Sequence, residues 1–118
     1  MPNPVVHFEI CVKDDAKGVQ FYTQLFDWKV KRDEKMGYNE VEAGPGGIGG
    51  GIFKSEEGKF PTYVTFHVQV DDIQQTLNKA VKLGGKLLMG VTPIPGIGSM
   101  GMFADLDGNA IGVYKSEK

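Results

Sequence analysis

The sequence predicts an α+β fold in which two βαβββ modules form a curved, barrel-like mixed sheet around a central cleft, with the helices outside. The first observation behind this prediction is an internal repeat. Five residues near the start of the chain recur 58 positions later, giving the pairs Val6 and Val64, Phe8 and Phe66, Val12 and Val70, Asp14 and Asp72, and Leu25 and Leu83. The segment 51–56 recurs 61 positions later, at 112–117. Two copies are too few for a solenoid, which needs about three, so we expect a single domain, 1–118, with modules at about 1–58 and 59–118.

The second observation is the order of local patterns in the first module. A strand predicted at Val5–Val12 alternates, with Val6, Phe8, Ile10 and Val12 on one face and Val5, His7, Glu9 and Cys11 on the other. Asp14 has the position of a helix N-cap. The helix that follows has an apolar stripe of Val19, Tyr22 and Phe26, with Phe21 and Leu25 beside it. Three further strands are expected at Trp28–Arg32, Gly37–Glu42 and Gly51–Lys54.

The second module repeats this order. Its first strand is predicted at Tyr63–Val70, with Val64, Phe66, Val68 and Val70 on one face and Tyr63, Thr65, His67 and Gln69 on the other. Asp72 caps a helix whose apolar positions are Ile73, Leu77, Ala80, Val81 and Leu83, and Gly84-Gly85 ends that helix. The remaining strands are predicted at Lys86–Met89, Met100–Ala104 and Ala110–Tyr114, with a hairpin turn at Asp107-Gly108.

These patterns predict where a ligand binds. We expect the apolar face of each first strand to pack under the helix of its own module. The opposite faces then look into the space that the sheets enclose, where His7, Glu9, Thr65, His67 and Gln69 share one concave surface. Clefts of this kind are the preferred sites for small ligands.

The composition excludes several classes of protein. A net charge of −2 over 118 residues argues against nucleic acid as the main partner. Lys29, Lys31, Arg32 and Lys35 are interspersed with Asp33 and Glu34, which is typical of a solvated surface. The chain has one cysteine, Cys11, a start without the features of a signal peptide, and no apolar run of bilayer length. We therefore expect a soluble, cytoplasmic protein without a membrane partner.

Two segments match the glycine spacing of dinucleotide-binding loops. They are Gly44 to Gly49 and Gly96 to Gly101. The motif requires a strand before it and a helix after it, whereas both segments lead into predicted strands. Chance matches are expected among 17 glycines, so nucleotide binding is not favoured.

Two histidines and a carboxylate are the residues with the clearest chemical potential. His7 and Glu9 point the same way on a strand because they are two positions apart, and His67 lies on the corresponding strand of the second module. Such a trio is able to hold iron or another divalent metal. Polar side chains in a cavity also orient organic ligands without any metal, and the residues leave both alternatives open.

Further residues have either a ligand-binding or a structural interpretation. The segment Thr92 to Ser99, rich in proline and glycine, is predicted as a loop that forms a rim of the cleft or an ordinary surface connection. Met89, Met100 and Met102 fit a cavity wall or the core equally well. The same ambiguity holds for Trp28 and Tyr38.

The chain resembles the vicinal oxygen chelate superfamily, which includes glyoxalase, bleomycin-resistance and extradiol dioxygenase proteins. The resemblance depends on the paired modules and on four motifs: Phe21-Tyr22 followed by Leu25-Phe26-Asp27-Trp28, Val70-Asp71-Asp72-Ile73, Gly84-Gly85, and Asp105-Leu106-Asp107-Gly108-Asn109. It covers nearly the whole chain, and it implies the fold more strongly than it implies a reaction.

The resemblance also implies where metal ligands belong, and this chain departs from that pattern. Metal-dependent members take ligands from the first and last strand of each module. His7 matches the first position, but Thr65 stands at the second, because His67 is displaced by two. The acidic positions fall on Gly51 and Gly112, which have no side chain to coordinate a metal. Such departures resemble a metal-ligand-poor bacterial subgroup of the superfamily.

We therefore expect a protein that binds a small, flat organic molecule in the cleft, with no cofactor favoured. The expected ligand-binding residues are His7, Glu9, Trp28, Tyr38, Gly51, Thr65, His67, Gln69, Met100, Met102, Gly112 and Tyr114. An alternative is a metal-dependent lyase, isomerase or dioxygenase that uses His7, Glu9 and His67 with a divalent metal. A third is metal-free acid–base catalysis by a histidine–Glu9 pair. Similar proteins are commonly dimers, so we also expect a homodimer.

Overall fold

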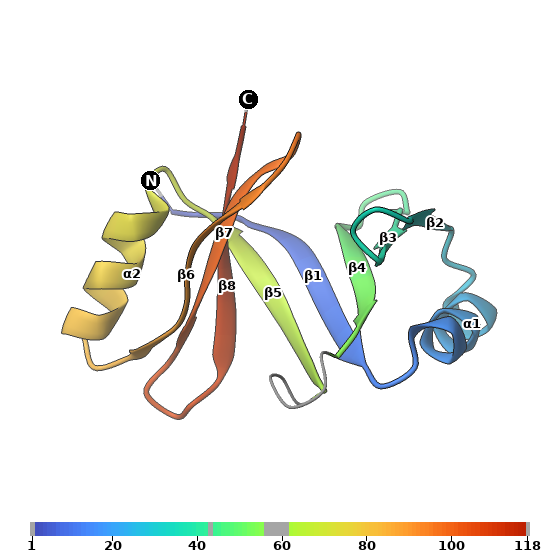
Figure 1. Cartoon of the computed structure of the whole chain (residues 1–118), viewed down its shortest axis with the longest axis horizontal. Helices are drawn as coiled ribbons and strands as arrows, with labels where there is room; N and C mark the ends of the chain where they lie inside the picture. Colours follow the sequence, from blue (N-terminus) through green and yellow to red (C-terminus); the bar gives the residue numbers. More distant parts are fainter. Residues whose placement is uncertain (1, 43, 56–61, 118) are drawn as a thin grey trace. The chain divides into compact units, whose positions relative to one another are not determined.

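A computed structural model describes residues 2–42, 44–55 and 62–117, which contain two helices and eight strands (Figure 1). In chain order these are β1 (Val5–Val12), α1 (Asp15–Phe26), β2 (Val30–Asp33), β3 (Tyr38–Val41), β4 (Gly49–Lys54), β5 (Tyr63–Gln69), α2 (Ile73–Lys82), β6 (Lys86–Ile94), β7 (Gly98–Ala104) and β8 (Ala110–Ser116). The βαβββ order therefore occurs twice, as predicted. Neither described helix is long and apolar enough to cross a bilayer.

The strands form one mixed sheet in the order β2-β3-β4-β1-β5-β8-β7-β6. In each module the first strand is parallel to the last, β1 to β4 and β5 to β8, whereas the pairs β2–β3, β3–β4, β6–β7 and β7–β8 are antiparallel. The α+β class and the paired modules are thus confirmed. The contacts divide the chain into an N-terminal unit, His7–Thr65, and a C-terminal unit, Met1–Val6 with Phe66–Lys118.

Both helices begin at the predicted caps. The carboxylate of Asp14 accepts a hydrogen bond from the backbone N–H of Lys17 at 3.1 Å, and that of Asp72 from the N–H of Gln75 at 3.0 Å. Each bond satisfies an amide that a helix start leaves without an intrahelical partner. Gly84 follows α2 with a φ of +108°, a value that favours glycine.

The core of the N-terminal unit lies between its sheet and α1. Its buried members are Ile10, Val41 and Ile52, with Phe8, Val12, Val19, Tyr22, Trp28 and Val30 packed against them. The prediction for the apolar face of β1 is confirmed at Phe8, Ile10 and Val12. The predicted helix stripe is wrong in part, because Phe26 is 53% exposed, and the side chains of Phe21 and Leu25 are also more than half exposed. Phe26 packs against Tyr22 and Trp28 instead of entering the core.

A polar network fastens the start of α1 to the neighbouring strands. Oδ2 of Asp15 accepts hydrogen bonds from Nη1 of Arg32 at 2.6 Å and from Nδ2 of Asn39 at 3.2 Å. The buried Asn39 amide also donates to the carbonyl of Ile52 at 2.9 Å. These contacts hold the pKa of Asp15 below its ordinary value, chiefly through the hydrogen bond from Asn39 and then through Arg32.

The core of the C-terminal unit lies under α2. Val70, Ile73, Leu77 and Val113 are buried there, and Val68 and Phe103 pack against them. The prediction that the whole apolar face of this strand is covered is wrong, since Val64 is 71% exposed and Phe66 is 40% exposed. Val81 and Leu83 are also largely exposed. The ten-residue helix places only Ile73 and Leu77, which are one turn apart, in buried positions.

The segment Thr92 to Ser99 is a β-hairpin, so the prediction of a loop is wrong. Thr92, Pro93 and Ile94 belong to β6, and they pair with Met100, Ser99 and Gly98 of β7. Proline is tolerated in this strand because β6 lies at the edge of the sheet, where one side of the backbone needs no ladder bond. Register shifts between Leu87 and Thr92 accommodate the irregular sequence.

Candidate functional site

The polar face of β1 lies on the side of the sheet opposite α1. In the register of the N-terminal unit, His7 is opposite Gly49, and Glu9 is opposite Gly51 of β4. Gly51 is also opposite Glu40 of β3. Residues in register share a face of the sheet, so Glu9, Gly51 and Glu40 form a row across three strands. We call the surface that carries His7, Glu9, Tyr38, Phe53 and Tyr63 the tyrosine face.

Tyr38 occupies the centre of the tyrosine face. Its hydroxyl lies 2.8 Å from Nε2 of His7, and the two rings are stacked with centroids 6.3 Å apart. The hydroxyl also fills the space beside the α-carbon of Gly51, so that a β-carbon at this position would overlap it. The missing side chain of Gly51 is therefore what allows Tyr38 to reach His7.

A second tyrosine binds the carboxylate of the same face. The hydroxyl of Tyr63 donates a hydrogen bond to Oε1 of Glu9 at 3.0 Å, and only 6% of Glu9 is exposed. Burial raises the pKa of Tyr38 and of Tyr63 well above the ordinary value, and the negative charge of Glu9 raises both further. Both phenols therefore stay protonated at neutral pH and offer hydrogen-bonding groups without charge.

Phe53 joins the two tyrosines, and the sequence analysis did not select it or Tyr63. The ring of Phe53 stacks on Tyr38 with centroids 6.0 Å apart and meets Tyr63 edge-on at 6.1 Å. Alternation gave a signal for both residues, since Phe53 is two positions after Gly51 and Tyr63 is two positions before Thr65. Cys11 of β1 is opposite Phe53 in the register, and burial raises the pKa of its thiol.

The predicted site residues of the C-terminal unit also share one face. His67 is opposite Gly112, Gln69 is opposite Tyr114, and β7 adds Met102 opposite Gly112 and Met100 opposite Tyr114. The imidazole of His67 occupies the space beside Gly112, as Tyr38 does at Gly51. In both units the glycine of the last strand thus accommodates a ring from a neighbouring strand.

Two further residues of the predicted ligand site, Trp28 and Thr65, belong to the N-terminal unit. Trp28 lies in the core between α1 and the sheet, where its ring is 5.3 Å from that of Phe8 and 5.8 Å from that of Tyr22. The structure therefore separates Trp28 from the tyrosine face. Thr65 is 6% exposed and lies two positions after Tyr63 on β5, in the N-terminal unit.

In the part of the chain that the structure describes, no group of three or more His, Cys, Asp or Glu residues is arranged to hold a metal ion. Within the N-terminal unit, Nε2 of His7 is engaged with Tyr38, and Gly51 supplies no carboxylate. The trio of His7, Glu9 and His67 draws on both units, and it stays a prediction.

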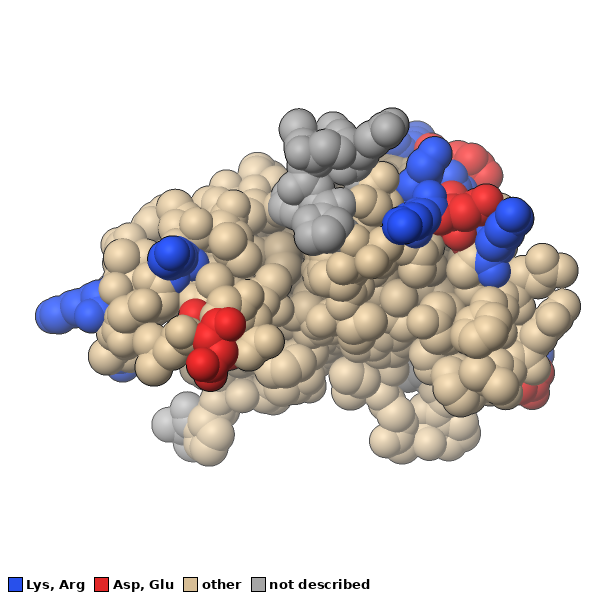
Figure 2. Space-filling model, turned by 90° about the horizontal axis from the view of Figure 1, so that it is seen from below, with Lys and Arg blue, Asp and Glu red and all other residues tan. Residues whose placement is uncertain are grey.

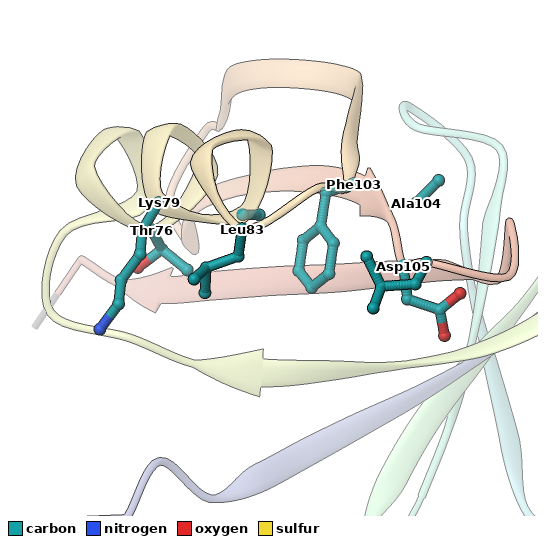
Figure 3. A pocket seen from close by; sticks show the side chains of 9 residues that line it. Thr76, Lys79, Leu83, Phe103, Ala104 and Asp105 are labelled. Carbon is teal, nitrogen blue, oxygen red and sulfur yellow. The ribbon is translucent and has the colours of Figure 1, made fainter.

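A separate pocket lies in the C-terminal unit, between α2 and the end of β7 (Figure 3). Its volume is about 330 Å³, and its lining is Thr76, Lys79, Ala80, Leu83, Gly85, Phe103, Ala104, Asp105 and Leu106. None of the predicted ligand-binding residues is among these. The pocket is bordered by Leu83 and Leu106, which are mostly exposed.

Charges of both signs are mixed on the surface. On the face shown in Figure 2, lysine and arginine side chains lie beside aspartate and glutamate side chains rather than in one broad basic area. Arg32 illustrates this mixing, since it pairs with Asp15 at 2.6 Å and with Glu34 at 3.8 Å. This agrees with the prediction of a solvated, mixed-charge surface around residues 29–35.

Known proteins resemble this chain over most of its length. A family model described as the Glyoxalase/Bleomycin resistance protein/Dioxygenase superfamily matches residues 5–113. "Putative glyoxylase CFP32" of Mycobacterium bovis and of Mycobacterium tuberculosis is 27% identical over 123 residues, which cover 89% of this chain and 42% of the relative. The chain thus spans less than half the length of these curated relatives.

Solved structures share the fold at low sequence identity. A glyoxalase/bleomycin resistance protein/dioxygenase superfamily member from Vibrio splendidus has a TM-score of 0.66 and 17% identity, covering 98% of this chain and 100% of that chain. Methylmalonyl-CoA epimerase from Mycobacterium tuberculosis has a TM-score of 0.67 and 14% identity, and the match covers 97% of this chain and 88% of the epimerase chain. At such identities the likeness shows the fold alone.

Proposed function

Because the chain belongs to the glyoxalase/bleomycin resistance protein/dioxygenase superfamily, we propose that it binds a small, flat organic molecule on the tyrosine face without a metal ion. The observation that carries this proposal is the contact of Tyr38 with His7 over Gly51. At the position where the resemblance implies a metal and its carboxylate ligand, this chain has a neutral phenol.

The donor set of the N-terminal unit supports binding without a metal. A divalent ion needs several nitrogen, oxygen or sulfur ligands around one point. A metal at Nε2 of His7 would have to displace the Tyr38 hydroxyl and would gain no ligand from Gly51. Organic binding needs no such change, because the phenol is already placed to contact a ligand.

The mixture of groups on the tyrosine face suits an organic molecule. Phe53 provides apolar surface between two phenols, and each phenol has its hydroxyl fixed by a partner. Small-molecule sites typically combine aromatic surface with a few placed polar groups in this way. We expect a planar ligand to lie against the rings and to exchange hydrogen bonds with the hydroxyls.

The first experiment measures metal binding. The purified chain is titrated calorimetrically with Zn²⁺, Ni²⁺, Mn²⁺ and Fe²⁺, and we expect no stoichiometric tight complex. A 1:1 complex that is abolished by His7→Ala contradicts the proposal and favours a metal-dependent lyase, isomerase or dioxygenase that uses His7, Glu9 and His67.

The second experiment locates organic binding. Aromatic fragments are screened by amide chemical shifts in the ¹⁵N-labelled chain, and the expected shifts centre on His7, Tyr38 and Phe53. Tyr38→Ala is expected to weaken binding, whereas Phe21→Ala, which removes an exposed aromatic ring of α1, leaves it unchanged. Shifts confined to other parts of the chain contradict the proposed site.

Self-association is a separate proposal. The homodimer implied by the resemblance is tested by light scattering of the purified chain after size-exclusion chromatography. Phe21 and Leu25 of α1 are 60% and 58% exposed, so their replacement by serine is the variant to compare.

A further inference from the structure

Two carboxylates flank the centre of the tyrosine face. Glu9 of β1 and Glu40 of β3 are both in register with Gly51, one on each side of it. Glu9 is buried, whereas Glu40 is exposed. Burial raises the pKa of Tyr38, and the negative charges of Glu9 and Glu40 raise it further.

Aromatic rings border these carboxylates. Tyr38 and Phe53 stack with an interplanar angle of 27°, and Tyr63 closes the row at 77° to Phe53. The three side chains are partly exposed. Ring faces attract cations through their quadrupole, and this attraction adds to that of a nearby carboxylate.

The edge strand β2 adds two further charges to this face. Lys31 is opposite Glu40, and Asp33 is opposite Tyr38. Lys31 therefore compensates part of the charge of Glu40, and Asp33 adds a further negative charge beside the aromatic row. The surface around Tyr38 is consequently acidic, and it disfavours an anionic ligand.

We propose that the ligand of the tyrosine face is an organic cation, a protonated or quaternary amine attached to a planar apolar group. This inference rests on the proposed function and specifies the ligand's charge. The amine lies toward Glu9 and Glu40, and the planar group lies against Phe53 and its neighbouring tyrosines. A neutral ligand of the same shape gains only the second of these contacts.

The test uses probes of similar size that differ in charge. Benzyltrimethylammonium and benzylamine are compared with benzyl alcohol and benzoate, with chemical shifts of the ¹⁵N-labelled chain as the readout. We expect the two cations to bind about ten-fold more tightly than the alcohol, benzoate to bind most weakly, and added salt to weaken the cations selectively.

Variants identify the carboxylates that provide the selectivity. Glu9→Gln is expected to remove most of the preference for cations, measured as the ratio of the affinities for benzylamine and benzyl alcohol within the same variant. Glu40→Gln, at an exposed position, is expected to lower the preference in part. Glu34→Gln in the turn after β2 is the matched control, and it leaves the preference unchanged.

The outcomes separate this inference from the proposed function. If benzyl alcohol or benzoate shifts the resonances of the tyrosine face at the same concentrations as the cations do, the charge preference is refuted, but organic binding at that face is retained. If the cations bind only elsewhere in the chain, both are refuted. Preferences that persist unchanged in Glu9→Gln and Glu40→Gln also overturn the inference.

Discussion

The hydroxyl of Tyr38 contacts Nε2 of His7 at 2.8 Å, and it does so across the position where Gly51 lacks a side chain. Three strands meet in this contact, since His7 is on β1, Tyr38 is on β3 and Gly51 is on β4 between them. The contact links the fold to the proposed function, because it places a neutral hydrogen-bonding group where a metal ligand is expected from the resemblance.

Gly51→Ala is expected to destabilise the protein by about 1–3 kcal/mol, because the new methyl group overlaps the Tyr38 hydroxyl. In the background of Tyr38→Ala the same substitution should cost at least about 1 kcal/mol less. Urea unfolding of the four proteins measures this coupling. Gly90→Ala is the control, since a β-carbon there meets no atom within 4 Å. Additive effects of Gly51→Ala and Tyr38→Ala contradict the proposed overlap.

The phenols of Tyr38 and Tyr63 should ionise only at a pH well above the ordinary value for tyrosine. Their pKa values are raised first by burial and then by the charge of Glu9. Glu9→Gln is therefore expected to lower the pKa of both Tyr38 and Tyr63, yet to leave them above normal. Absorbance at the phenolate band during alkaline titration reports this, with Tyr38→Phe and Tyr63→Phe for assignment. An unchanged titration in Glu9→Gln argues against the Glu9 contact.

The Asp15 network should make stability depend on pH in the acidic range. The folded-state pKa of Asp15 is lowered, so its contribution is fully present above the unfolded-state pKa of about 3.9 and is lost as the pH falls through the folded value. The difference in unfolding free energy between wild type and Asp15→Asn should therefore shrink between pH 6 and pH 3. Asp27→Asn, at a side chain that is 96% exposed, serves as the control and should show no such trend.

Two leucines of the predicted α2 stripe should differ in their contribution to stability. Leu77→Ala is expected to cost about 2–5 kcal/mol, because Leu77 is 1% exposed beneath α2. Leu83→Ala is expected to change stability by less than about 0.5 kcal/mol, because Leu83 is 68% exposed. Thermal or urea unfolding compares the two, and equal losses are inconsistent with the observed core.

Local sequence patterns predicted strand faces and helix starts correctly, but they did not predict which apolar side chains are buried. Alternation placed His7 and Glu9 on one face of β1, and capping chemistry located the start of each helix at Asp14 and Asp72, because both signals lie within a few residues of the chain. The exposure of Val64 was not predictable in this way. Its apolar side chain fits the alternation of β5, but burial requires a covering element, which alternation along the strand does not specify.

The sequence by itself determined the repeated βαβββ order, the helix caps and the face on which each strand carries its polar residues, since these follow from neighbours along the chain. Tertiary structure decided which residues meet on that face. The register of β3 and β4 brings Tyr38 to His7 and Glu40 to the row of Glu9, and contacts between strands fix this register. Alternation placed Phe53 and Tyr63 on the polar sides of their strands, but only contacts between strands bring Phe53 to Tyr38 and Tyr63 to Glu9, where we propose that a ligand binds.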